Sequence, residues 1–404
     1  MLEVPPLGTE QVTLREAAGR VLAQTVVAAH DLPPTRLSAM DGYAVRSADL
    51  RDASDGASVV LRVVASIAAG TTFTGIVGPG EAVAIPTGGV VPEGADAVVM
   101  VEFTAPVEGA GVGGYVQAGA WVRVSRPAPV HANVVQAGDD LKAGAEILGA
   151  GRRLRAGDLA ALASFGLVDV PVYRRPRIAV LATGSEICPP EKTPRPGQVR
   201  DSNQYVICAE VESAGGIAVA AGIVADDLDH LRSTVLRLVA QNDGVILSGG
   251  SSVGPKDLTG RVLAALAPPG VLFHGIDIRP GKPTVFARAG AKPVVGMPGF
   301  PTSSMVVFEA FVRPLLARMG GESTPDTWPA AVPARLTSGY AKPASREDYP
   351  RVRLVERDGA WWADVLPGGS AAISNVIFAD GLARIPAGIE RLDEGGLVAV
   401  RRFG

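Results

Sequence analysis

The chain has 404 residues, 47% of them hydrophobic, and a formal net charge of −3. A chain of this length exceeds what one compact core supports, so we expect two to four domains. The slightly acidic balance argues against a general nucleic-acid or polyanion binder, whose basic excess would show in the composition. Any anion-binding site must therefore be local.

Cysteine usage and the amino terminus indicate where the protein works. Only Cys188 and Cys208 occur, without paired Cys/His spacing, which favours neither a structural zinc site nor a disulfide framework. The amino terminus lacks the charged and apolar regions of a signal peptide, and no apolar run reaches 18 residues. We expect a soluble cytoplasmic protein that binds neither nucleic acid nor membrane.

The amino-terminal third begins with a helix signal and continues as β structure. Residues 13–23 combine a capping box, Thr13 with Glu16, and apolar residues at helical spacing, which predicts a short helix. From residue 31 to about 130, short Val/Ile-rich segments alternate with Gly and Pro, as is typical of a small β domain. Asp41-Gly42 and Thr87-Gly88 in this domain also fit ordinary turns.

The segments on either side of the central part of the chain are shorter. Residues 158–165 predict a helix that ends at Gly166, residues 168–173 a strand, and residues 174–176, Arg-Arg-Pro, a domain boundary. After residue 322 short strands return, and Asp358-Gly359 between two apolar runs predicts a hairpin. The last 80 or so residues are therefore predicted to form a compact β domain.

Residues 177–320 carry the clearest pattern, in which strands alternate with helices. We expect strands at 178–181, 217–224, 245–247, 271–278, 284–288 and 293–297. We expect helices from a cap at Asp201 or Ser202 through Ala214, at 228–240, after 257, and from 302 to a stop at 320–321. Strands that are apolar on both faces and alternate with helices predict a doubly wound parallel sheet.

The ligand crevice of such a sheet lies beyond the carboxyl ends of its strands. The residues that follow the predicted strands there are Thr183, Gly184, Ser185, Glu186, Asp226, Asp227, Ser248, Gly249, Gly250, Ser251, Ser252, Gly254, Pro298 and Gly299, and Asp257 opens the next helix. Glycines with hydroxyls and carboxylates suit a phosphate ester bridged by Mg²⁺. Pro255 stands where a P-loop has its lysine, and turns with helix caps are the alternative reading.

A basic turn follows in residues 278–283, Ile-Arg-Pro-Gly-Lys-Pro. Arg279 and Lys282, held by a rigid Pro/Gly turn, could bind an oxyanion. The alternative is that both side chains are solvated at the surface.

The chain resembles the molybdopterin molybdenumtransferase family, to which the E domain of gephyrin also belongs. Seven motifs occur in family order: Ser-Ala-Met-Asp-Gly-Tyr-Ala from Ser38, Ile-Pro-Thr-Gly-Gly from Ile85, Gly-Asp-Asp from Gly138 with Lys-Ala-Gly from Lys142, Leu-Ala-Thr-Gly-Ser-Glu from Leu181, Ser-Gly-Gly-Ser-Ser-Val-Gly from Ser248, Arg-Pro-Gly-Lys-Pro from Arg279 and Met-Pro-Gly-Phe-Pro from Met297.

This resemblance implies a homodimer that uses adenylated molybdopterin and molybdate, requires Mg²⁺ and releases AMP. It also implies four domains: residues 1–30 with 131–175 as a discontinuous linker and dimerisation domain, residues 31–130 as a β domain covering the partner's active site, residues 176–322 as the doubly wound α/β domain that binds molybdopterin, and residues 323–404 as a β-barrel-like domain.

Site roles are carried over by motif. Glu186 and Asp257 would hold Mg²⁺, with Asp226 or Asp227 nearby. Arg279, Lys282 and Ser303 would face the pterin phosphate or molybdate, with Arg351 and Ser370 from the carboxyl-terminal domain. Asp41 and Thr87 would reach the site of the partner subunit.

Some residues depart from the family pattern. Phe300 stands where asparagine is usual, Thr302 and Ser251 where valine is common, and Arg279 where lysine is frequent. Two other functions remain as alternatives: the molybdopterin adenylyltransferase that precedes this step, which shares the doubly wound domain and could also be a partner, and a non-catalytic scaffold like gephyrin.

Overall fold

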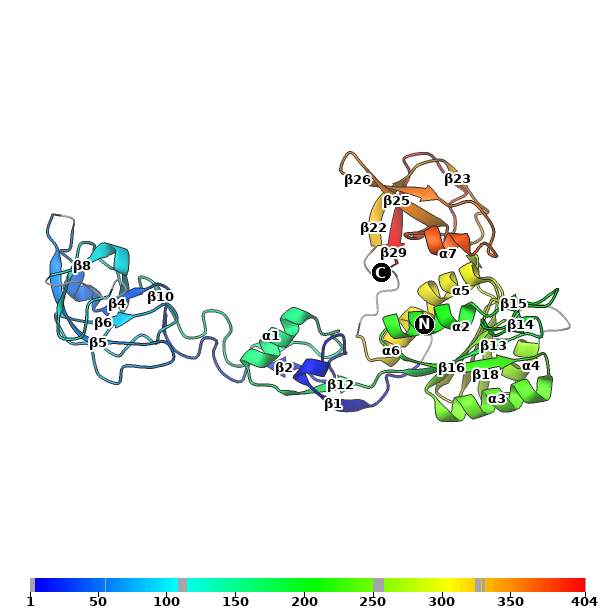
Figure 1. Ribbon diagram of the computed structural model, residues 1–404, viewed down its shortest axis with the longest axis horizontal. Helices are drawn as coiled ribbons and strands as arrows, with labels where there is room; N and C mark the ends of the chain where they lie inside the picture. Colours follow the sequence, from blue (N-terminus) through cyan, green and yellow to red (C-terminus); the bar gives the residue numbers. More distant parts are fainter. Residues whose placement is uncertain are drawn as a thin grey trace. The chain divides into compact units, whose positions relative to one another are not determined.

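The computed structural model describes residues 4–54, 56–107, 115–249, 258–323, 328 and 331–403 (Figure 1). The chain forms two compact units, one made of Thr25–Gly149 with Ser164–Gly166 and the other of the remaining segments. No helix among the described residues is long and apolar enough to cross a membrane. The four-domain division predicted from the sequence is finer than these two units, and its boundaries stay a prediction.

The unit of residues 25–149 is built on a six-stranded sheet, which confirms the predicted β structure. Its strands, in spatial order, are β7 (Ala97–Met100), β4 (Gly42–Val45), β6 (Glu81–Ile85), β5 (Val59–Ser66), β9 (Trp121–Val124) and β8 (Thr104–Pro106). Tyr43 and Val45 pack into one core and Ala44 into another, because alternate side chains of a strand point to opposite faces. The sheet is therefore covered on both sides.

Short strand pairs and short helices lie in this unit and in the segments that flank it in the sequence, residues 4–24 and 150–173. The pairs are β3 (Leu37–Ser38) with β10 (Val134–Val135), β2 (Val26–Val27) with β11 (Glu146–Leu148), and β1 (Thr9–Thr13) with β12 (Asp169–Tyr173); the helices are η1 (Leu14–Glu16), η2 (Ser47–Leu50), η3 (Val101–Phe103) and the longer α1 (Ala156–Ser164). Residues far apart in sequence thus pair along this part of the chain.

The predicted helix at residues 13–23 is wrong. The capping box of Thr13 and Glu16 does form, but η1 is a single 3-10 turn. The backbone turns at Gly19, where φ is +73°, and Leu22 then bridges β12. An extended partner strand is a stronger determinant here than the helical spacing of the side chains.

The other unit contains the predicted doubly wound sheet. Its strands, in spatial order, are β16 (Ile217–Val224), β13 (Arg177–Thr183), β17 (Gly244–Ser248), β21 (Lys292–Met297), β20 (Val285–Ala289) and β18 (Pro269–His274). The first four are mutually parallel, and β20 and β18 extend the sheet as antiparallel strands. The short pair β14 (Ile187–Cys188) and β15 (Val199–Arg200) lies outside it.

Helices cover both faces of this sheet (Figure 1). They are α2 (Asn203–Ser213), α3 (Leu228–Gln241), α4 (Leu258–Ala264), α5 (Pro301–Val307) and α6 (Arg313–Met319), with the π-helical turn η4 (Phe308–Val312) between the last two. Ile178 and Val180 of β13 pack with α2, α5 and α6, whereas Ala179 and Leu181 pack with α3 and α4. The continuous apolar run of β13 is therefore buried on two sides, as expected of a central parallel strand.

The carboxyl-terminal residues form the predicted β domain, a closed barrel. Its strands, in spatial order, are β22 (Ala331–Leu336), β26 (Ala360–Val365), β25 (Arg351–Arg357), β27 (Gly381–Arg384) and β29 (Leu397–Arg402), with β23 (Tyr340–Ala341), β28 (Arg391–Leu392) and α7 (Ser374–Phe378) beside it. Asp358 and Gly359 have positive φ and join β25 to β26 as the predicted hairpin. The barrel pairs with the α/β domain through β19 (Ile278–Arg279) and β24 (Glu347–Asp348).

Candidate functional site

A cavity of about 660 Å³ opens at the carboxyl edge of the parallel strands. Residues from three strand ends line it, among them Thr183 at the end of β13, Ser248 at the end of β17 with Gly249 after it, and Gly299 after β21. This is the crevice that the strand order of an open α/β sheet leaves for a ligand. The convergence expected from the sequence is thus present for these residues.

Close backbone packing explains the glycines. Gly249 has a φ of +102°, and a Cβ on it would lie 2.3 Å from the carbonyl oxygen of Thr183. Only glycine lets β17 leave the sheet this near to β13. Gly299 in turn lies against the Cα of Gly249. The cavity wall is therefore bare backbone, which suits close approach by a phosphate.

Asn203 fixes the polar wall of the cavity. This residue is 6% exposed at the start of α2, and its Nδ2 donates to Ser248 Oγ and to the carbonyl of Gly299, both at 2.8 Å. One amide thus ties the ends of β17 and β21 together. The sequence predicted this stretch only as the start of a helix, and Asn203 was not among the predicted site residues.

Asp201 also lines the cavity and was not among the predicted site residues. Its side chain is 6% exposed and lines the cavity, and Oδ1 accepts a hydrogen bond from Gln204 N at 3.1 Å. Burial raises the pKa of this carboxyl above its ordinary value. The sequence predicted Asp201 only as a possible cap of this helix, and capping by itself explains an acid at such a position.

The predicted acids are not all in the cavity. Glu186 lines it, and its carboxylate lies over Gly184, where a Cβ would come within 2.6 Å of Oε2. Asp226 instead accepts a hydrogen bond from Ser185 N at 3.2 Å, while Ser185 Oγ accepts one from Asp226 N. Asp227 caps α3 by accepting from His230 N at 2.8 Å. Glu186 is therefore the predicted acid best placed to meet a ligand.

Several predicted residues lie outside the described part of the chain. They are Gly250, Ser251, Ser252, Gly254 and Asp257. Their roles in holding the nucleotide and Mg²⁺ stay predictions.

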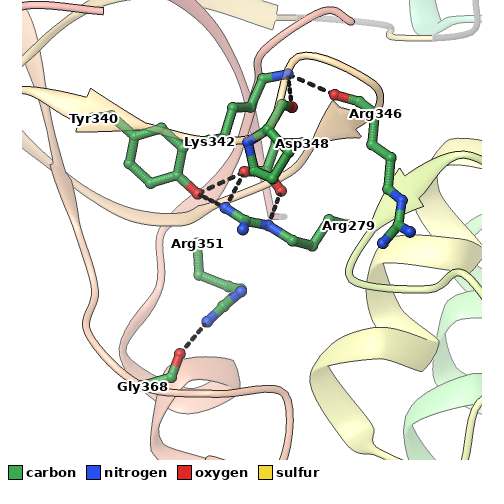
Figure 2. Close-up of polar contacts among 8 residues, drawn as sticks. Arg279, Tyr340, Lys342, Arg346, Asp348, Arg351 and Gly368 are labelled. Carbon is green, nitrogen blue, oxygen red and sulfur yellow. Dashed lines mark hydrogen bonds and ion pairs between the residues drawn. The ribbon is translucent and has the colours of Figure 1, made fainter. Parts of the chain in front are cut away.

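A basic cluster occupies the junction between the α/β domain and the barrel (Figure 2). Arg279 Nε and Nη2 donate to the two carboxylate oxygens of Asp348 at 2.9 and 2.6 Å, and Nη2 also donates to Tyr340 Oη at 3.1 Å. Asp348 is 2% exposed, whereas 43% of the Arg279 side chain is exposed, so a buried carboxylate holds a partly exposed guanidinium. Burial and the Asp348 carboxylate raise the pKa of Tyr340 to about 12. Arg279 is thus fixed in an ion pair while part of its side chain still faces solvent.

Arg351 extends this cluster. It is 9% exposed, donates from Nη2 to the carbonyl of Gly368 at 2.9 Å, and its pKa is lowered by burial (Figure 2). Lys282 is exposed, and its ammonium bonds to none of the described residues. Ser303 is buried in α5, and the carbonyl of Ser370 accepts a hydrogen bond from the neighbouring Thr302. The predicted basic residues therefore differ in their surroundings: Arg279 is held in an ion pair, Arg351 is buried and Lys282 is exposed.

Asp41 and Thr87 form a contact of their own in the unit of residues 25–149. Asp41 Oδ1 accepts hydrogen bonds from Thr87 N at 2.7 Å and from Thr87 Oγ1 at 3.0 Å. These two bonds hold the pKa of the Asp41 carboxyl below its usual range. Asp41 is therefore an ionised, oriented and exposed carboxylate.

Comparisons with known proteins cover nearly the whole chain. Residues 1–166 match the model of the MoeA N-terminal region (domain I and II), residues 179–318 a probable molybdopterin binding domain, and residues 333–403 the MoeA C-terminal region (domain IV). Each of the three models thus matches a separate segment, in chain order.

Full-length relatives agree. A molybdopterin molybdenumtransferase of Nostoc sp. is 35% identical over 97% of this chain and 88% of its own length, and one of Bacillus subtilis is 32% identical over 97% and 89%. The crystal structure of the molybdopterin biosynthesis moea protein from Pyrococcus horikosii superposes with a TM-score of 0.83 at 34% identity, over 100% of this chain and 96% of that one. The chain therefore belongs to the MoeA family of molybdopterin molybdenumtransferases.

Proposed function

We propose that this protein transfers molybdenum from molybdate to adenylated molybdopterin and releases AMP. The observation that carries the proposal is the full-length match to molybdopterin molybdenumtransferases, together with a cavity at the strand ends of the segment that matches a molybdopterin binding domain. In this reaction the two dithiolene sulfurs of the pterin form Mo–S bonds in place of two Mo–O bonds of molybdate, and the displaced oxygens leave as water or hydroxide. A water molecule cleaves the phosphoanhydride to AMP and the pterin phosphate. The final molybdenum ligands come from the substrate, which agrees with the scarcity of cysteine.

The polar wall of the cavity supplies the nucleotide end of the proposed site. Thr183, Ser248 and the backbone at Gly249 offer hydroxyl and amide groups to phosphate oxygens. The glycine positions remove the steric barrier to close approach. The proposal assigns binding and orientation of the phosphoanhydride to these groups.

The donor set in the cavity fits Mg²⁺, whose requirement is part of the proposal. Carboxylates are hard oxygen ligands, and Glu186 and Asp201 both line the cavity. Asp257, the other Mg²⁺ ligand predicted from the sequence, lies outside the described residues, and substrate phosphates and water would complete the shell. Bound there, Mg²⁺ would neutralise charge that develops on the leaving phosphate.

The basic cluster supplies the oxyanion end of the proposed site. Arg351 is a largely desolvated cation. The attraction between its guanidinium group and a bound anion is stronger where water is excluded. Asp348 neutralises Arg279 and holds it in one orientation, which leaves Arg351 and the exposed Lys282 as the freer positive charges. We assign the pterin phosphate or molybdate to this region.

Two further parts of the proposal concern assembly. Asp41 and Thr87 would complete the active site of a partner subunit in a homodimer, where the ionised Asp41 meets the substrate. The cytoplasmic location expected from the sequence, and delivery of substrate by an upstream adenylyltransferase, stay predictions.

Purified protein with adenylated molybdopterin, molybdate and Mg²⁺ should release AMP and yield a product that contains molybdenum. Glu186→Gln should lower AMP release at least tenfold with little change in thermal stability, because a metal-positioning carboxylate acts mainly in the transition state. Glu191→Gln, an exposed acid outside the cavity lining, is the matched control and should retain full activity.

Formation of adenylated product from molybdopterin and ATP, without molybdenum transfer, would instead identify an adenylyltransferase. Equal AMP release by Glu186→Gln and wild-type protein would remove Glu186 from the site.

A further inference from the structure

Phe300 occupies a position where its residue type works against the local structure. It is the N-cap of α5, with Pro301 at the first helical position, and its side chain makes no capping hydrogen bond. Ser, Thr, Asp and Asn are favoured at N-caps because their oxygens satisfy the free backbone N–H groups of the first turn. Phe300 forgoes this stabilisation and leaves 54% of a large aromatic residue exposed. Such a local conflict is expected at functional sites.

The exposed ring lines the cavity described above. Ile373, also a large exposed apolar residue, lines the same cavity. Thr302 Oγ1 donates a hydrogen bond to the carbonyl of Ser370, which joins the segment that carries Phe300 to the segment that carries Ile373. An apolar surface of this kind is therefore built into the cavity rather than scattered over the surface.

The cavity consequently combines two kinds of lining. Asp201, Asn203 and Ser248 are buried polar groups, whereas Phe300 and Ile373 offer flat apolar area. A ligand that contacts both the polar and the apolar lining has an aromatic ring system with a charged or polar extension. Stacking on an aromatic side chain tolerates any flat ring because every such ring has a π-face.

We propose that Phe300 is a specificity-determining residue whose ring stacks on a planar nitrogen heterocycle of the substrate. The inference rests on the proposed function, since adenylated molybdopterin contains two such ring systems, the adenine and the pterin. The shared chemistry is a flat fused heterocycle next to a phosphate. The phosphate lies toward the backbone at Gly249, and the ring lies against Phe300.

The test measures the binding of AMP and of 6-hydroxymethylpterin separately by calorimetry, so that the two rings are distinguished. Phe300→Asn should weaken the binding of one of them about tenfold, within the range measured for loss of one stacked base. The same variant should melt at an equal or higher temperature, because asparagine is a good N-cap. Phe300→Trp should retain binding. Phe378→Asn removes an equally exposed aromatic residue, at the end of α7 and outside the cavity lining, and should leave binding unchanged.

Weaker binding combined with unreduced stability distinguishes stacking from a general loss of structure. Unchanged binding of both probes to Phe300→Asn, or no binding of either probe to wild-type protein, would overturn the inference. Molybdate-dependent AMP release by wild-type protein is measured in parallel, so failure of the stacking inference and failure of the proposed function give different results.

Discussion

Asp201 shows how one buried side chain can serve structure and chemistry together. Its Oδ1 accepts the backbone N–H of Gln204 at the start of α2, and the same carboxyl lines the cavity. Capping alone would be served equally well by serine or asparagine at lower desolvation cost. A carboxylate kept at a buried position with a raised pKa is a candidate for metal or proton chemistry.

Asp201→Asn should separate these two roles. Because burial raises the folded-state pKa of Asp201, the folded protein holds its proton more tightly than the unfolded chain, and stability falls as pH rises through that pKa. Asparagine keeps an acceptor for Gln204 N and cannot ionise. We expect denaturant unfolding at pH 7 to give a free energy equal to or above that of wild type, and the difference to close below pH about 4.

AMP release by Asp201→Asn should fall at least tenfold in the same preparation. Asp229→Asn, in the exposed first turn of α3, is the control and should change neither property. A loss of stability at pH 7 would contradict the assigned desolvation cost, and full activity would leave Asp201 a helix cap only.

At the scale of elements, the sequence predicts what local chemistry decides. The Asp358-Gly359 hairpin forms because both residues adopt positive φ, and α3 begins where Asp227 can cap it. The helix expected at residues 13–23 does not form, because Leu22 bridges Val172 of β12, some 150 residues away, and Val21 bridges Arg153. The cavity shows the same difference between local and long-range determinants. The lining residues at strand ends could be predicted from the sequence, whereas Asp201 could not, because its place depends on which loop folds over the strand ends.

The π-helical turn η4 is a tertiary feature of this kind. It carries Glu309, which is 2% exposed and pairs with Arg313 at 2.7 Å and with Arg401 of the barrel at 2.6 Å. Arg313 also pairs with Glu210 of α2 at 2.5 Å. These four charges link the α/β domain to the barrel. No local pattern predicts such a cluster, since its members come from α2, η4, α6 and β29.

Glu210→Gln tests the electrostatics of this cluster. Burial, followed by repulsion from Glu309, raises the pKa of Glu210 to about 7. Between its ordinary pKa and this value the folded state retains a proton that the unfolded chain has released, so stability falls with rising pH across that window. Above the folded-state pKa, the folded protein has to bury an ionised carboxylate at Glu210, which lowers the free energy of unfolding; an uncharged glutamine side chain avoids this loss. We expect Glu210→Gln to raise the free energy of unfolding at pH 8 by about 1–2 kcal/mol and to have little effect at pH 4.5.

Glu212→Gln is the matched control, because Glu212 is exposed on the same helix and should leave the pH dependence unchanged. A destabilised Glu210→Gln variant at pH 8 would mean that the pair with Arg313 contributes more than the burial of Glu210 costs.

At the scale of the whole molecule, the residues proposed for the active site come from both units. Asp41 and Thr87 belong to the unit of residues 25–149, and the cavity with Glu186 belongs to the other. Asp41 is exposed and ionised, and two hydrogen bonds from Thr87 orient its carboxylate. An oriented surface carboxylate of this kind is explained if a second copy of the chain brings it a ligand.

Subunit mixing provides the decisive measurement for a shared active site. Asp41→Ala and Glu186→Ala homodimers should each be nearly inactive, because every site lacks one group. In a heterodimer of the two, one site receives Asp41 from one subunit and Glu186 from the other and is intact, while the second site lacks both. Heterodimers purified with two affinity tags should therefore recover about half of the wild-type AMP release per dimer. A mixture of Glu186→Ala with Glu186→Gln chains cannot rebuild a site and should stay inactive. If tagged Asp41→Ala/Glu186→Ala heterodimers show no recovery, Asp41 and Glu186 act within the same chain or not in the same site.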